Sequence, residues 1–308
     1  MNREPDVSVV MSIYNGARSL GATIESVLTQ DASFELIAVN DGSTDPSAAV
    51  LDSYARSDRR VKVIHQNNQG LTRALIRGCR VARGEYLARQ DVGDVSLPGK
   101  LSKQLSFARD HPTAALVSCG TRFVGPNHEF LYNVLHDPSD ATDRLLTLRI
   151  EDLRGPSSHP SAMFRRALYS EVGGYRSAFN FAQDLDLWIR LAERGDHIVM
   201  PEILYEASID ITAISARYRK EQISTAKLIL ECAKLRRQGL SEELALQRAS
   251  YIKPSPSSTP GRLARARALY FIGTCLNKND RQGAEGYFRR ALTACPLHVK
   301  AMLRLIAG

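Results

Sequence analysis

The chain has 308 residues, enough for one large domain and an appendage. Its content of 44% hydrophobic and 24% charged residues is ordinary for a globular protein, and no apolar run reaches the roughly 18 residues of a membrane-spanning helix. The net charge of +8 favours an anionic partner such as a nucleotide, an acidic glycan or lipid headgroups. Nucleic acid is not expected, because neither zinc-finger spacing nor an aromatic RNA-binding signature is present.

The five cysteines are odd in number and scattered, and no pair has the CxxC spacing of a zinc or redox site. Reduced thiols are the default in the cytosol, and residues 1–6 lack the apolar core of a signal peptide. We therefore expect a cytoplasmic protein, with peripheral attachment to the inner face of the membrane as the alternative.

Apolar, β-branched segments alternate with helical patterns through the first third of the chain. Strands are expected at residues 7–14, 34–39, 61–64 and 86–89, and helices at residues 17–29, 48–57, 71–82 and 99–110. We expect Gly84 to end the third helix as its C-terminal glycine. Four strand–helix repeats predict a doubly wound α/β domain. The first strand–helix junction has no GxGxxG, which argues against a Rossmann-type dinucleotide cradle.

An acidic segment follows the fourth strand. Asp91 and Asp94 stand three residues apart, and Pro98 is placed where a helix can begin. Ligands bind at the carboxyl edge of open α/β sheets, and two carboxylates without a neighbouring cation usually hold a divalent metal or a cationic group. Oxygen ligands suit Mg or Mn, and these ions suit diphosphates. The alternative is an acidic turn that only caps the next helix.

The pattern is less regular between residues 111 and 218. Strands are expected at residues 114–119 and 122–124, a loop with a helix at 132–153, a rigid loop at 155–160 and a turn at 173–175. Asp184 lies near the N-terminus of a further helical pattern, where the macrodipole keeps a carboxylate ionised and able to act as a general base. By spacing alone we favour the alternative, in which Asp184 or Asp186 merely caps the helix.

Strand signals stop past residue 217. Helices are expected at residues 221–237, 241–249, 262–276 and 282–293, with a Pro- and Ser-rich linker at 254–260. We divide the chain into an α/β domain at 1–218 and a helical region at 219–308, which includes a pair at 262–308 resembling a tetratricopeptide repeat, although Gly273 is out of register. A lone repeat cannot bury its own face, so these helices should cap the α/β domain or bind a partner protein. We expect the arginine-rich face of these helices to contact either an anionic membrane or solvent.

Several segments of residues 5–218 together resemble the family 2 glycosyltransferases, which are inverting enzymes of the GT-A fold. Residues 7–16 resemble the first strand of that family with its YN ending, residues 39–45 resemble its VDDGSTD segment, and residues 88–98 resemble its DADDxxxP metal segment. The acceptor half of the family is matched, in the expected order, by His159-Pro160, residues 173–175 and residues 184–191. The resemblance implies a mixed sheet with a Rossmann-like nucleotide-binding half and a C-terminal helical appendage.

On the nucleotide side, the resemblance implies a role for each matching residue. Tyr14 would stack on the nucleobase, Asp41 would bond to its edge, and Ser12 would lie beneath them. Arg73 would contact the ribose or the diphosphate, and Asp91 would be the first acid of the metal segment.

On the acceptor side, the resemblance implies that Asp184 is the catalytic base. Asp184 would take the proton from the acceptor hydroxyl as that hydroxyl attacks the anomeric carbon, so that one displacement inverts the stereochemistry. His159 and Trp188 would lie beside the acceptor.

The sequence departs from the family pattern at the metal segment. Gly93 stands where the acid that most directly holds the metal is expected, and glycine offers no side-chain ligand. Asp91 and Asp94 remain, and they reach one Mg or Mn ion only if the turn folds back. The divalent metal is therefore a weak expectation.

Two cations of the family pattern are also missing, at about Ser208 and Asp210, and Gln183 replaces the usual Glu before the base. We expect Arg73, Arg77 or Arg89 to share the diphosphate charge instead, because guanidinium groups bind such oxygens in pairs.

The sequence thus predicts transfer of a sugar from a nucleoside-diphosphate sugar to a hydroxyl of a glycan or lipid-linked acceptor, in cell-surface polysaccharide or glycoconjugate biosynthesis. The alternative is a catalytically weak or inactive nucleotide-sugar-binding scaffold whose C-terminal helices bind a partner. A nucleotidyltransferase is disfavoured, because the N-terminal part has no glycine-rich, lysine-bearing phosphate loop.

Overall fold

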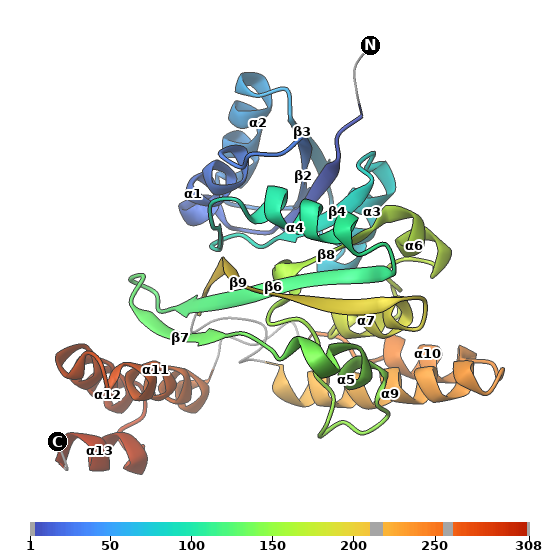
Figure 1. Cartoon of the computed structure of the whole chain (residues 1–308). Helices are drawn as coiled ribbons and strands as arrows, with labels where there is room; N and C mark the ends of the chain where they lie inside the picture. The colour runs from blue at the N-terminus through green and yellow to red at the C-terminus, as the bar shows by residue number, and fades with distance from the viewer. Residues whose placement is uncertain (1–3, 210–217, 255–260, 307–308) are drawn as a thin grey trace.

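The computed structural model of the chain describes residues 4–209, 218–254 and 261–306 (Figure 1). Within these ranges one mixed sheet of nine strands has the order β3-β2-β1-β4-β8-β6-β9-β5, and β7 pairs with β6. The strands are β1 (Val7–Ile13), β2 (Phe34–Asp41), β3 (Val61–Gln66), β4 (Tyr86–Gln90), β5 (Val95–Ser96), β6 (Ala114–Val124), β7 (Phe130–Val134), β8 (Ala162–Arg165) and β9 (Asp196–Ser208). Strands β1 to β4 are parallel, whereas β8 is antiparallel to both β4 and β6.

Helices cover both faces of this sheet. Those of the α/β domain are α1 (Ala17–Leu28), α2 (Ser47–Ser57), α3 (Leu71–Val81), α4 (Lys100–Asp110), α5 (Ala141–Leu146), α6 (Arg166–Glu171) and α7 (Gln183–Ala192). Successive strand residues point to opposite faces, so alternate residues of β1 enter two cores. Val9 packs in a core with Ile24 of α1, whereas Val10 packs in a second core with Leu75 of α3. The predicted mixed α/β sheet with helices on both faces is confirmed.

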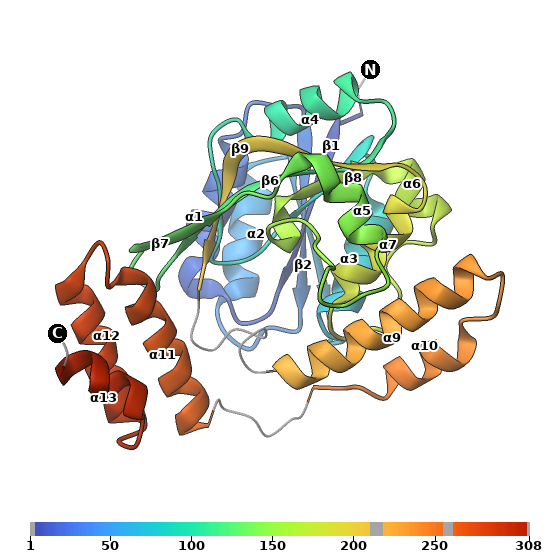
Figure 2. The same ribbon diagram turned by 60° about the horizontal axis from the view of Figure 1, so that its bottom comes forward.

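The C-terminal helices pack on the α/β domain at two places (Figure 2). Helices α9 (Arg219–Arg237) and α10 (Glu243–Ser250) share a core with α7, in which Ile229 and Ala233 pack with Ile189. Helices α11 (Arg262–Leu276), α12 (Arg281–Ala294) and α13 (Val299–Ile306) form a unit that packs against Leu131 of β7. Figure 2 shows the two groups apart from each other, with α11–α13 at the left beside β7 and α9 and α10 at the right below α7. No helix in the described ranges is long and apolar enough to cross a membrane.

Two strand predictions between residues 114 and 134 were wrong. Residues 114–124 form the single strand β6 instead of two strands, and residues 130–134 form β7 instead of a loop. Gly120 does not break β6, because its missing side chain leaves room for β9: an added Cβ would lie 3.0 Å from Ile203 Cγ1. The register of β6 against β9 shifts on both sides of Gly120, which absorbs the irregularity without ending the strand.

Gly84 also has a different role from the predicted one. Helix α3 ends at Val81, and the capping residue Ala82 is extended. An added Cβ on Gly84 would lie 2.4 Å from the backbone nitrogen of Ser8, so glycine is required where this loop crosses β1. Helix α13 was not predicted, and residues 255–260 of the predicted linker lie outside the described residues.

Candidate active site

The loops after β1 and β2 are joined by hydrogen bonds at the carboxyl edge of the sheet. Asn15 adopts a left-handed conformation, with φ of 54°, and its Oδ1 accepts a 2.7 Å hydrogen bond from the backbone nitrogen of Thr44. In return, the nitrogen of Ala17 donates to Asp45 Oδ2 at 3.0 Å. These contacts fix the turn beside Tyr14, whose side chain remains 55% exposed and free to stack on a planar ligand.

Asp41 ends β2 and holds the loop that precedes α3. Its carboxylate is only 2% exposed and accepts hydrogen bonds from Gln66 Nε2 at 2.7 Å, Gln69 N at 2.9 Å and Gly70 N at 2.8 Å. Arg73 is exposed on the first turn of α3, just beyond this loop. Asp41 therefore orders the loop that presents Arg73, and its contact with a base edge stays a prediction.

Replacing Asp41 by Ala should weaken nucleotide binding at least about tenfold and lower the melting temperature. The change removes the acceptor of three partly buried hydrogen bonds, from Gln66, Gln69 and Gly70, each worth about 0.5–1.5 kcal/mol. Calorimetric titration with UDP or GDP, together with thermal unfolding, measures both effects. Asp58→Ala is the matched control, since Asp58 also accepts a backbone hydrogen bond, at 2.9 Å from Arg60 N, on the far end of α2. An unchanged dissociation constant for Asp41→Ala would place the nucleotide elsewhere.

The two carboxylates of the acidic segment point to different partners. Asp91 is 39% exposed and accepts a 2.5 Å hydrogen bond from Arg89 Nη1. Asp94 is only 8% exposed and turns toward β9, where the hydroxyl of Tyr205 donates to its Oδ2 and the nitrogen of Ser208 to its Oδ1, both at 2.9 Å. Burial, with the charge of Asp91 added, raises the pKa of Asp94 to about 7.

This arrangement limits what the segment can offer to a metal. The described residues contain no group of three or more His, Cys, Asp or Glu side chains that could hold one. Gly93 has a φ of +95°, so an acid at this position would be strained even though the nearest atom, Ser19 Oγ, would lie 3.6 Å from an added Cβ. Asp91 is left as the open carboxylate. Mg²⁺ is often held by one or two carboxylates together with substrate phosphates, and Asp91 fits that arrangement.

Arg89 is a buried cation beside Asp91. It is 3% exposed at the end of β4, and its Nε has no hydrogen-bond partner among the described residues. Burial opposes its charge, but the neighbouring Asp91 carboxylate raises the pKa of Arg89 above its usual range. Burial lowers the pKa of His159 and the charge of Arg89 lowers it further, whereas at Asp184 burial raises the pKa and the charge of Arg89 offsets this only in part. The direct ion-pair partner of Arg89 is Asp91.

Asp184 lies on the first turn of α7, behind a residue with unusual backbone geometry. Ala182 is left-handed, with φ of 50°, and the preceding segment is tied to α3 by a 2.7 Å hydrogen bond from Thr72 Oγ1 to the carbonyl of Phe179. The Asp184 side chain is 26% exposed, and its Oδ1 accepts a 2.9 Å hydrogen bond from Leu185 N. Burial raises the pKa of Asp184, which brings this carboxylate closer to the range of a useful base.

His159 supports Asp184 from behind. Its Nδ1 lies 3.8 Å from Asp184 Oδ2, and its Nε2 lies 2.7 Å from the hydroxyl of Tyr175. Burial lowers the pKa of His159 well below its usual value, so the ring is neutral. If the Tyr175 hydroxyl donates to Nε2, the remaining proton on Nδ1 points toward Asp184. Trp188 is 5% exposed and meets the His159 ring edge-on at 5.8 Å, and its place beside an acceptor stays a prediction.

The structure places the predicted residues in two groups. Asp91 pairs with Arg89 and Asp184 lies beside His159, whereas Tyr14 and Asp41 border the joined loops of β1 and β2. Sequence reasoning gave no role to Tyr175 or Tyr205, which hold His159 and Asp94, although Tyr175 belongs to the resembling segment at residues 173–175. Ser208 contributes only its backbone, and Asp210 lies outside the described residues.

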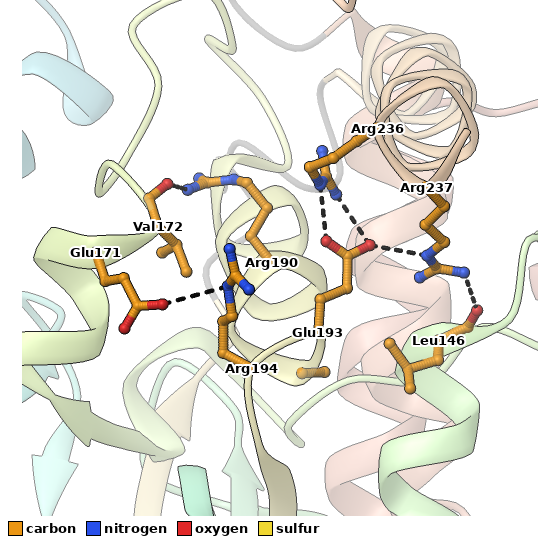
Figure 3. Close-up of a pocket in the computed structure, with 9 residues that line it drawn as sticks. Leu146, Glu171, Val172, Arg190, Glu193, Arg194, Arg236 and Arg237 are labelled. Atoms are coloured by element: carbon orange, nitrogen blue, oxygen red, sulfur yellow. Dashed lines mark hydrogen bonds and ion pairs between the residues drawn. The ribbon is translucent and has the colours of Figure 1, made fainter. Parts of the chain in front are cut away.

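A cavity of about 740 Å³ lies away from these groups, between the end of α7 and α9 (Figure 3). Its arginines are paired: Arg236 and Arg237 donate to Glu193, and Arg194 contacts Glu171. Arg190 donates to the carbonyl of Val172 at 2.6 Å. Figure 3 shows the Glu193 contacts linking the end of α7 to α9, whereas Arg190 and Arg194 contact Val172 and Glu171 at the end of α6. The cavity therefore belongs to a structural contact, and we do not assign it to the active site.

Comparison with known proteins identifies the family of the chain. The family model described as "Glycosyl transferase family 2" matches residues 8–173, more than half of the chain. The putative glycosyltransferase EpsE of Bacillus subtilis is 30% identical over 275 residues, which are 87% of this chain and 96% of EpsE. The O-antigen biosynthesis glycosyltransferase WbnJ of Escherichia coli is 28% identical over 74% of this chain and 85% of WbnJ.

Solved structures show the same fold. The structure of S. aureus TarS 1–349 in complex with UDP superposes with a TM-score of 0.57 at 14% identity, covering 97% of this chain and 87% of TarS. The mannosyltransferase PcManGT of Pyrobaculum calidifontis, in complex with GDP-Man and Mn²⁺, gives a TM-score of 0.56 at 18% identity, with 99% and 85% covered. The chain has the GT-A fold and belongs to glycosyl transferase family 2.

Proposed function

We propose that this glycosyltransferase moves a sugar, with inversion, from a nucleoside-diphosphate sugar to a hydroxyl of a growing cell-surface polysaccharide or a lipid-linked acceptor. The observation that carries the proposal is that Arg89, buried at the end of β4, pairs with Asp91, while Asp184 on α7 lies beside His159 of the segment that contacts β4. One carboxylate faces the donor edge of the sheet, and the other lies on the first turn of α7. Such a pair suits a single displacement, which needs one group at the leaving diphosphate and one base at the incoming hydroxyl.

In this reaction Asp184 accepts the proton of the acceptor hydroxyl as the new glycosidic bond forms and the bond to the diphosphate breaks. His159 lies beside Asp184, with Nδ1 3.8 Å from Oδ2, and is itself held by Tyr175. Arg89 orients Asp91, and its charge partly offsets the effect of burial, which raises the pKa of Asp184. A bound Mg²⁺ or Mn²⁺ would be held by Asp91 and would neutralise charge on the leaving diphosphate.

The donor and acceptor classes are supported by similar proteins. TarS has been solved with UDP and with UDP-GlcNAc, and PcManGT with GDP-Man. We therefore assign a UDP- or GDP-linked sugar as the donor. WbnJ is an O-antigen biosynthesis enzyme, and a hyaluronan synthase of Pasteurella multocida is 26% identical over 67% of this chain. Both names refer to the synthesis of a polysaccharide, which supports a polysaccharide acceptor for this chain.

A panel of UDP- and GDP-sugars, titrated with and without Mn²⁺, tests the proposal. We expect one donor to bind with higher affinity when Mn²⁺ is present, and its slow hydrolysis to release the nucleotide. Because Asp91 is the open carboxylate, chelator should weaken turnover without abolishing binding. The anomeric configuration of the released sugar, followed by NMR from the start of the reaction, reports inversion. Binding without any turnover would instead favour the inactive scaffold, and the absence of binding across the panel would contradict both.

A further inference from the structure

The positive charge of the chain is concentrated in its last helical unit. Residues 261–306 contain nine Lys and Arg residues and two acidic residues, a net charge of +7, whereas the whole chain carries +8. The nine cations are all exposed. They are Arg262, Arg265, Arg267, Lys278, Arg281, Arg289, Arg290, Lys300 and Arg304. The rest of the chain is therefore close to neutral, and the α11–α13 unit is the part that attracts an anionic surface.

Helix α13 adds an apolar face to this charge. Ala301 and Leu305 pack inward against the α11–α12 pair. The outward positions recur at the spacing of one helical face and are all apolar: Val299, Met302, Leu303 and Ile306. Ile306 is 74% exposed and Leu303 is 55% exposed, and the preceding Leu297 is 88% exposed. Lys300 and Arg304, which are both exposed, are interleaved with this face.

We propose that the α11–α13 unit docks the enzyme on an anionic phospholipid surface, with the apolar face of α13 entering the boundary between headgroups and acyl chains. A short helix with an apolar face and interleaved cations has the composition of an interfacial helix. The cations lie on all three helices, so a broad surface of the unit can face anionic headgroups. Figures 1 and 2 both show the unit projecting from one edge of the α/β domain beside β7, which leaves it open to a flat surface.

This surface is separate from the candidate active site, so binding can be measured without any sugar transfer. The full chain is mixed with vesicles of equimolar phosphatidylcholine and phosphatidylglycerol, or of phosphatidylcholine alone, and the bound fraction is measured by flotation. We expect binding to the anionic vesicles that weakens as salt rises. Leu303→Ser with Ile306→Ser should lower the partition coefficient about a hundredfold, because two large apolar side chains no longer enter the lipid. Arg289→Gln with Arg290→Gln should lower it about thirtyfold.

Matched control variants lie outside the unit. Leu244 and Tyr251, near the two ends of α10, are each 74% exposed, so Leu244→Ser with Tyr251→Ser removes two side chains at least as exposed as Leu303 and Ile306 and should leave binding unchanged. Arg56→Gln with Arg59→Gln removes two exposed cations near the end of α2 and should also leave binding unchanged. Equal binding of the wild-type chain to neutral vesicles, or equal losses in the control variants, would overturn the proposal. Light scattering that shows a dimer in the wild type and a monomer in Leu303→Ser/Ile306→Ser would overturn it in favour of a second copy.

Discussion

Asp184→Asn should reduce kcat by about a hundredfold to ten-thousandfold, the range expected for removal of a general base. Asparagine keeps the size of the side chain and can still accept the hydrogen bond from Leu185, which is 2.9 Å long in the wild type. Helix α7 should therefore keep its start, and donor affinity should stay within about twofold, since the change removes a group that acts on the acceptor. Turnover and calorimetric donor binding, measured on the same preparation, separate the two effects.

The pH dependence offers an independent check on Asp184. The reaction needs the ionised carboxylate, so kcat/KM falls as the pH drops through the pKa of Asp184. Burial raises that pKa, and the acid limb should therefore lie above the usual range of an aspartate and vanish in Asp184→Asn. Asp196→Asn, at the exposed start of β9, is the control and should leave the profile unchanged. An acid limb and a kcat that survive in Asp184→Asn would remove this residue as the base.

Asp186→Asn, unlike Asp184→Asn, should greatly lower the stability of the folded chain. Asp186 is 1% exposed, and it accepts hydrogen bonds from Arg190 Nη2 at 2.6 Å and from Arg176 Nε at 3.0 Å. Removing its charge leaves the buried Arg190 with only carbonyl partners. Breaking a buried ion pair in this way costs about 3–5 kcal/mol, which corresponds to a fall in melting temperature of about 6 °C or more for a chain of this size.

Urea unfolding and thermal scans measure this loss. Glu231→Gln is the matched control, because Glu231 pairs with Arg248 at 2.8 Å with both side chains largely exposed. An exposed pair contributes at most about 1 kcal/mol. If Asp186→Asn lowered the free energy of unfolding by no more than about 1 kcal/mol, the cluster around Asp186 would not link α7 to the helices that follow.

The N-terminal half of the fold was predictable because its strands are buried on both faces. Parallel strands of this kind are continuous apolar runs, and β1 and β2 follow that pattern. β6 does not, since Gly120 and Arg122 interrupt its apolar run. Pairing with β7, which follows directly in a hairpin, and with β9, which lies far along the chain, keeps residues 114–124 extended. Pairing between strands therefore determines the extent of β6, which the local sequence pattern does not predict.

The candidate site was predictable only as a set of residue types. Asp184 and Asp186 lie two positions apart on one helix, and spacing alone favoured a cap for either residue. The structure gives neither of them the capping position, which Ala182 occupies; it buries Asp186 between two arginines and leaves Asp184 partly open. Asp94 was expected beside Asp91, yet Tyr205 and Ser208 turn its carboxylate toward β9. These partners are more than 100 residues away, so no local pattern reports them.

The hydrogen bond from Thr72 to the carbonyl of Phe179 spans 107 positions of sequence and joins the half of the domain that holds Asp41 to the half that holds Asp184, the proposed donor and acceptor halves. It fixes the segment that leads into α7 against the helix that starts at the Asp41-bound loop. The two halves are therefore not interchangeable modules. A chimaera that exchanges the acceptor half with that of a relative would have to inherit a hydroxyl at position 72 and a backbone that returns to meet it. A graft made only at the boundaries of the resembling segments would lose this alignment.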